Sequence, residues 1–259
     1  MGHIRLARLP RTKSWEQVVE LLRDGGSTGE LAAATAHAAE TELWSSKGDP
    51  ALAYTVWLLT QLPLAARSQQ FGERLGELGF EAGAEQSVLS LVAGFSLAVD
   101  RNVAGRSNRT DLGELARQAA IESLSSILGS TTKSLFGTTS DDVQRELGRL
   151  ATKDRFARLA RDFFARLTQK TLEYYIDREL PNHVGRGKSL LTIDHQIEFR
   201  AALERHCRET ALIVEEFAGG WYSKSNFQGT LSPATAQAFA DYTLKKLRDE
   251  LRRRRASNA

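Results

Sequence analysis

The chain has 259 residues, 41% hydrophobic and 26% charged, a balance that excludes an intrinsically disordered or fibrous protein. Its single cysteine, Cys207, excludes an intrachain disulfide, and because no apolar signal segment opens the sequence we expect a cytoplasmic protein. The formal net charge of +3 combines basic ends with an acidic middle. The most apolar run, residues 51–66, is shorter than the roughly 20 residues that span a membrane.

Residues 1–13 form a basic N-terminal arm that contains no acidic residue. Because the arm is poor in apolar anchors, we expect it to become ordered only when it binds a partner. Its candidate contact residues are Arg5, Arg8, Arg11 and Lys13.

Two capping boxes predict the first two helices. In Ser14–Gln17 and Ser27–Glu30 the serine and the side chain three residues later can each bond a free backbone N–H group at the helix start. The first helix is expected to run to Arg23, and the second, which is rich in alanine, to about Trp44.

The next two helices are predicted from a proline and from a long apolar run. Asp49–Pro50 is an N-cap followed by proline, and the helix that it opens reaches Pro63, where a kink or a new helix continues to Leu78. Residues 88–99 form a further apolar helix. A strand over residues 88–92 is the alternative, which the neighbouring alanine and leucine residues disfavour.

A polar loop is expected over residues 102–108, followed by a helix that starts at Thr110–Asp111 and ends at Gly129. Residues 129–140 are dense in glycine, serine and threonine, so they are the best candidate for a linker. Ser140–Asp142 is expected to cap the next helix, with its acids at the positive end of the helix dipole.

The longest helical pattern covers residues 154–180. Apolar side chains recur there at intervals of three and four residues, which places them on one face of an α-helix. We therefore expect this helix to be the central element of the fold. Its first apolar face consists of Phe156, Leu159, Ala160, Phe163 and Leu167.

Residues 181–189 are expected to form a basic loop that ends in Gly-Lys-Ser. A phosphate-binding P-loop needs a glycine at position 182 and a preceding strand, but position 182 is asparagine and the preceding element is a helix. Nucleotide binding is therefore disfavoured. The remaining hypothesis is that His183, Arg186 and Lys188 contact phosphate or an acidic partner.

A second long helix is predicted over residues 192–217, ended by Gly219–Gly220. Five of its residues could in principle ligate a metal ion: Asp194, His195, Glu198, His206 and Cys207. Of these, His195 and Glu198 have suitable helical spacing, whereas the last two lie two to three turns away. The favoured interpretation is a buried cysteine and partly exposed histidines, with no metal site.

Residues 221–231 are expected to be irregular, with Trp221 and Tyr222 beside Lys224 as a surface contact. Ser232–Pro233 then starts the last helix, whose end is strongly basic. The candidate phosphate or protein contacts at this end are Lys245, Lys246, Arg248, Arg252, Arg253, Arg254 and Arg255.

Together the patterns predict an all-α protein, an irregular bundle of about eight to ten helices without significant sheet. Residues 14–251 would form one helical domain, with a possible subdivision near 129–140, between the N-terminal arm and a basic tail at 252–259.

The expected function is that of a non-catalytic adaptor or subunit of a larger assembly, with another protein as its partner and no cofactor. The excess of arginine over lysine is typical of a bacterial genome. An accessory protein that binds the nucleic-acid backbone is the alternative, since the basic ends could neutralise phosphates. A third possibility is an enzyme whose site is assembled across helices.

Overall fold

The computed structural model describes residues 12–24, 26–38, 48–80, 87–104, 110–131, 139–177 and 193–258. All regular elements in these ranges are α-helices, eleven in number, so the predicted all-α bundle is confirmed for the described part of the chain. None of these helices combines the length and the apolar character needed to span a membrane.

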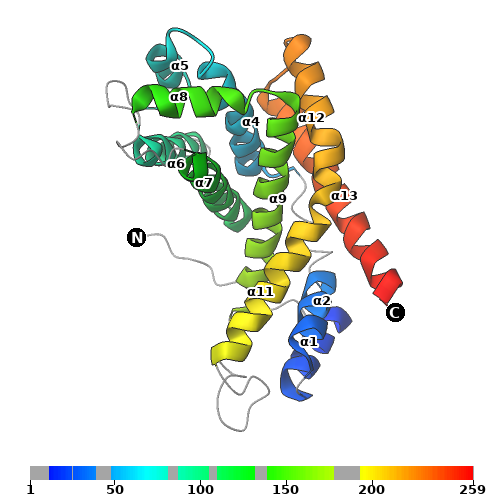
Figure 1. Cartoon of the computed structure of the whole chain (residues 1–259). Helices are drawn as coiled ribbons and strands as arrows, with labels where there is room; N and C mark the ends of the chain where they lie inside the picture. The colour runs from blue at the N-terminus through cyan, green and yellow to red at the C-terminus, as the bar shows by residue number, and fades with distance from the viewer. Residues whose placement is uncertain are drawn as a thin grey trace.

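The central helix is α9 (Lys153–Ile176), as the sequence pattern predicts (Figure 1). It contacts α7 (Asp111–Thr131), α11 (Ile193–Thr210) and α12 (Leu212–Phe227), and more weakly α2 (Thr28–Ala38). The predicted apolar face from Phe156 to Leu167 is buried, and its buried threonines are satisfied within the helix. Thr168 Oγ1, for example, donates to the carbonyl oxygen of Phe164 at 2.8 Å, so α9 buries several faces without leaving these hydroxyls unpaired.

Helices α4 to α8 follow one another in the chain and form one part of the bundle (Figure 1). Of these, α7 contacts α9 directly, α4 packs on α7, and α6 lies outside α7 and α4. Their bounds are α4 Pro50–Ala65, α5 Phe71–Glu77, α6 Val88–Ala104, α7 Asp111–Thr131 and α8 Ser140–Arg149. The alternative of a strand over residues 88–92 is wrong, because these are the first five residues of helix α6.

The remaining helices complete the other side of the bundle. The close pairs are α1 with α2, α2 with α11, α12 with α9, and α13 with α4. Their bounds are α1 Lys13–Asp24, α2 Thr28–Ala38, α11 Ile193–Thr210, α12 Leu212–Phe227 and α13 Pro233–Asn258.

The start of α1 lies earlier than the capping box at Ser14 predicts. The backbone N–H of Trp15 donates to Thr12 Oγ1 at 3.4 Å, so Thr12 occupies the position before the helix. Ser14 lies inside α1, where its hydroxyl is 3.4 Å from His37 Nε2. The prediction was wrong because a second hydroxyl residue two positions earlier satisfies the free N–H.

The capping box at Ser27–Glu30 is confirmed. Ser27 Oγ accepts from the N–H of Glu30 at 3.2 Å, and Glu30 Oε2 accepts from the N–H of Ser27 at 3.0 Å. These bonds to its charged form lower the pKa of the Glu30 carboxyl. At α8 the box is formed by Thr139 and Asp142 rather than by Ser140.

The predicted helix over residues 192–217 is two helices, with a break at Ala211. The predicted stop at Gly219–Gly220 is also wrong, because both glycines lie inside α12. A Cβ atom on Gly219 would lie 2.5 Å from the carbonyl oxygen of Lys153. Gly219 therefore allows α12 to approach the start of α9 closely, and it does not end a helix.

Candidate partner-binding surface

Several predicted contact residues lie outside the described part of the chain. In the basic arm these are Arg5, Arg8 and Arg11, while Lys13 is the first residue of α1 and is exposed. The loop residues His183, Arg186 and Lys188 also lie outside it.

The polar residues of α11 do not converge on one point. Within the described ranges, no three His, Cys, Asp or Glu side chains lie close enough together to hold a metal ion. Cys207 is 1% exposed and packs in the core, and burial raises the pKa of its thiol. Burial, and secondarily Arg254, lowers the pKa of His206.

The basic end of the chain continues as helix α13, and part of its charge stabilises the fold. Glu250 is only 8% exposed, and it accepts from Arg254 Nε at 3.0 Å and pairs with Arg253 at 2.7 Å. Arg254 also donates to the side chain and to the carbonyl oxygen of Glu209 at 2.9 and 3.1 Å. It thereby ties α13 to the end of α11.

The other bases of α13 divide by exposure. Arg248 pairs with the neighbouring Asp249 at 3.1 Å and is half-buried. Lys245 and Arg252 are exposed. Lys246 is half-buried, with its Nζ 5.5 Å from the centre of the Tyr242 ring.

The prediction that Trp221 and Tyr222 lie in an irregular surface segment is wrong. Both residues are in α12, and Tyr222 is 1% exposed and stacked on Phe156 at 3.9 Å between ring centres. Trp221 is half-buried and stacked on Phe239 of α13 at 3.9 Å. The two residues are adjacent in sequence, so on a helix they point about 100° apart, and here one faces the core and the other faces α13.

An aromatic platform lies where α12 and α13 run side by side. We define the platform as Phe217 and Trp221 of α12 with Tyr242 of α13. The Phe217 and Tyr242 rings meet edge to face at 5.0 Å, and Tyr242 remains 46% exposed. Phe239 lies beneath, within 6.0 Å of Phe217. The platform therefore presents a surface aromatic group whose rings are held by neighbouring rings.

This platform is continuous with the aromatic core. Phe239 contacts Phe164 of α9 at 6.0 Å, and Trp221 lies 6.3 Å from Phe156 of the same helix. Such tilted and edge-to-face pairs have a preferred geometry. The rings at the surface are consequently held in place by their contacts with rings of the central helix.

Lysine side chains flank the platform on both helices. Lys224 lies less than one turn beyond Trp221 on α12, and Lys246 is one turn beyond Tyr242 on α13. Neither these lysines nor Lys245 forms an ion pair within the described residues. Asp249, about one turn beyond Lys246, pairs with Arg248 at 3.1 Å.

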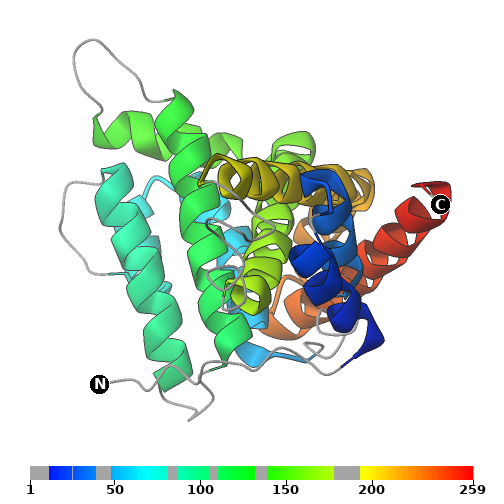
Figure 2. The same ribbon diagram turned by 90° about the horizontal axis from the view of Figure 1, so that it is seen from below.

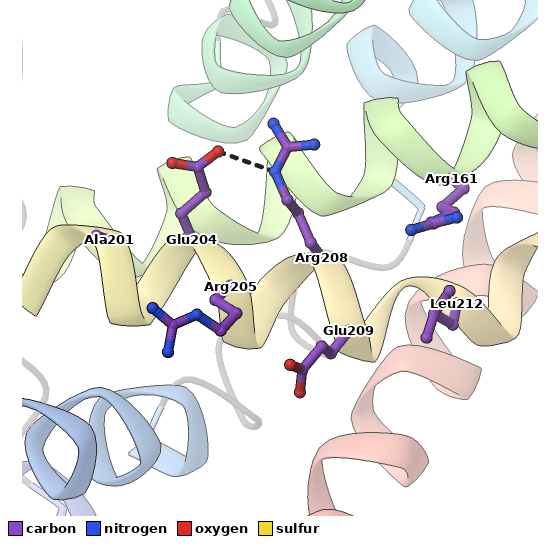
Figure 3. Close-up of a pocket in the computed structure, with 7 residues that line it drawn as sticks. All are labelled: Arg161, Ala201, Glu204, Arg205, Arg208, Glu209 and Leu212. Atoms are coloured by element: carbon purple, nitrogen blue, oxygen red, sulfur yellow. Dashed lines mark hydrogen bonds and ion pairs between the residues drawn. The ribbon is translucent and has the colours of Figure 1, made fainter.

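Figure 3 shows a pocket of about 240 Å³ on the outer side of α11, near its junction with α12. Glu204 accepts from Arg208 at 2.8 Å on one side of the helix, whereas Arg205 and Glu209 point away on the other. The charged groups thus diverge and alternate in sign. The pocket is lined by Arg161, Ala201, Glu204, Arg205, Arg208, Glu209 and Leu212.

Comparison with protein-family models, with curated proteins and with solved structures finds no match for this chain.

Proposed function

We propose that this protein is a binding subunit or adaptor that docks another protein on the aromatic platform between α12 and α13. The observation that carries the proposal is a group of pre-positioned rings, of which Tyr242 is exposed and Phe217 and Trp221 are half-buried, beside lysines that form no ion pair within the described residues. Aromatic residues are enriched at protein interfaces, where buried tyrosine and tryptophan side chains contribute most of the binding energy. A rigid platform also reduces the entropy lost on binding.

The charges around the platform indicate the chemistry of the partner. Lys224, Lys245 and Lys246 would attract a segment that carries aspartate or glutamate beside apolar side chains, because complementary charge speeds encounter and fixes register. Arg253 and Arg254 already neutralise Glu250 of this chain. The partner contact is therefore assigned to the lysines rather than to all the basic residues of α13.

The test compares variants in quantitative affinity purification from the native cells. Tyr242→Ala should lower the recovery or affinity of a specific stoichiometric partner by at least about tenfold, as expected for an interface hot spot. Lys246→Glu should weaken the same partner several-fold by reversing a rim charge. Arg23→Glu is the matched control, since Arg23 is exposed on α1 and has no ion pair within the described residues.

Each outcome decides the proposal. A partner that is lost with both platform variants and retained with Arg23→Glu supports it. Equal recovery with all variants contradicts it. Recovery of nucleic acid whose binding falls steeply with salt would assign the lysines to phosphate contacts and would also contradict it.

A further inference from the structure

A second pocket, of about 380 Å³, lies at the corner where the chain passes from α4 into α5. Its walls combine apolar side chains, among them the half-buried Leu64 and Leu78, with polar side chains of the turn and of α5. Pockets of roughly 300–1,000 Å³ that mix apolar walls with a few polar groups are typical of small-molecule sites. The corner pocket therefore has the size and the composition of such a site.

Helix α8 holds the turn at this corner in place. It packs on α4 and lies at the outside of the bundle in both Figure 1 and Figure 2. Gln144 of α8 donates through Nε2 to the carbonyl oxygens of Ala66 and Ser68, at 3.1 Å in both cases. In return, Arg67 Nε donates to the carbonyl oxygen of Gly148 at 3.2 Å. The turn is consequently preorganised, which reduces the entropy lost when a ligand binds.

Two lining residues of the turn carry hydrogen-bond donors that the protein itself does not use. Within the described residues, the two Nη groups of Arg67 form no hydrogen bond and its guanidinium forms no ion pair. The Ser68 hydroxyl accepts from the N–H of Gln70 at 3.1 Å, and its own proton has no acceptor in the same part of the chain. A planar guanidinium can donate two parallel bonds to the two oxygens of a carboxylate. The turn thus supplies donors suited to an anionic oxygen group.

The other charged groups of the pocket favour a ligand with a single negative charge. Arg74 pairs with Glu77 on α5 at 2.8 Å, so these two lining residues neutralise each other. The net charge of the lining is then that of Arg67 alone. A group with two negative charges would meet the Glu77 carboxylate with only one uncompensated arginine to offset the repulsion.

We propose that the corner pocket binds a small organic monocarboxylate, with its carboxylate on Arg67 and Ser68 and its apolar part against Leu64 and Leu78. The donors of the turn and the leucines of the two helices correspond to the two parts of such a molecule. The pocket shares no residue with the aromatic platform. The two proposals therefore stand or fall separately.

The first test titrates the whole chain with isovalerate and follows the backbone amide NMR signals. Isovalerate should shift the signals of Ser68 and Leu78 in a saturable way, with a dissociation constant on the order of 1 mM, as expected for so small a ligand. Isovaleramide, which has the same shape without the charge, should bind at least about tenfold more weakly. Inorganic phosphate, which has no apolar part and a second charge, should do the same. No saturable shift at these residues, or equal binding of either control compound, would overturn the proposal.

The second test repeats the isovalerate titration with variants of the arginine. Arg67→Gln should weaken binding at least about tenfold, and Arg67→Lys, which keeps the charge but loses the paired donors, several-fold. Arg23→Gln is the matched control and should leave the affinity unchanged, because Arg23 is exposed on α1 and forms no ion pair within the described residues. The same spectra show whether each variant keeps the fold. Unchanged affinity in either folded Arg67 variant contradicts the assignment of the site.

Discussion

Two adjacent glycines of α12 have opposite surroundings. A Cβ atom on Gly219 would lie 2.5 Å from Lys153 O and 3.2 Å from the Cβ of Ala157, whereas a Cβ on Gly220 would meet nothing within 4 Å. Gly219→Ala should therefore lower the free energy of unfolding by about 1–3 kcal/mol through overpacking. Gly220→Ala should raise it by roughly 0.5–1 kcal/mol through helix propensity.

Urea unfolding followed by circular dichroism measures both glycine variants. Because the two substitutions add the same methyl group one residue apart, each serves as the control for the other. A similar effect of both, in either direction, would show that α12 and α9 do not approach as closely as described.

His206 gives stability a dependence on pH. Burial, assisted by Arg254, lowers its pKa from the ordinary value of 6.5, so the folded protein holds the ring neutral while the unfolded chain takes up a proton. The unfolded state thus binds more protons as the pH falls below about 6.5, and the contribution of His206 to stability is lost in that range. Above it the contribution is fully present.

The test of this pH effect is a comparison with His206→Gln. Between pH 7.5 and 5.5, the unmodified protein should lose more unfolding free energy than the variant, as measured by urea unfolding at each pH. An equal loss in both proteins would remove His206 as the cause.

At the level of the elements, Arg254 connects the end of α13 to the end of α11. Arg254→Ala should lower the free energy of unfolding by about 1–3 kcal/mol, because the nearly buried carboxylate of Glu250 loses one of its two arginine partners. Lys245→Ala, on the exposed side of the same helix, should change it by less than about 0.5 kcal/mol.

Thermal and urea unfolding of the two α13 variants distinguish a stabilising arginine from a free basic tail. If Arg254→Ala unfolds at the same urea concentration as Lys245→Ala, the contact between α13 and α11 contributes nothing to the fold.

The position of a helix could be predicted where neighbouring residues in the sequence determine it. Helix ends and breaks that depend on packing between helices were missed. The face of α9 follows from its apolar spacing, and the start of α4 from the Asp49–Pro50 pair. The sequence predicts a helix stop at Gly219, because a glycine required by a close helix contact cannot be distinguished in the sequence from one required by a turn. The break at Ala211 has no glycine or proline to mark it.

The candidate surface could be predicted only in part, for the same reason. The sequence indicates basic residues near the C-terminus, but it does not distinguish Arg254, which binds Glu209 and Glu250, from Lys245 and Lys246, which pair with no acid among the described residues. Phe217 and Trp221 are one turn apart, and so are Tyr242 and Lys246, a spacing visible in the sequence. Their meeting across two helices is a tertiary contact that no local pattern contains.

At the scale of the whole molecule, the candidate surface combines groups from two helices. The platform between α12 and α13 presents aromatic rings, of which Tyr242 is 46% exposed, beside Lys224 and Lys246. We propose that it binds a partner segment that carries both acidic and apolar side chains.

Site-specific photo-cross-linking in the native cells tests the docking proposal most directly. A photoreactive phenylalanine analogue in place of Tyr242 should capture one protein, through a segment rich in acidic and apolar residues, and the same analogue in place of Phe227 should not capture it. Cross-links from position 242 to nucleic acid, or the same set of proteins from both positions, would contradict the assignment of the platform as a protein-docking surface.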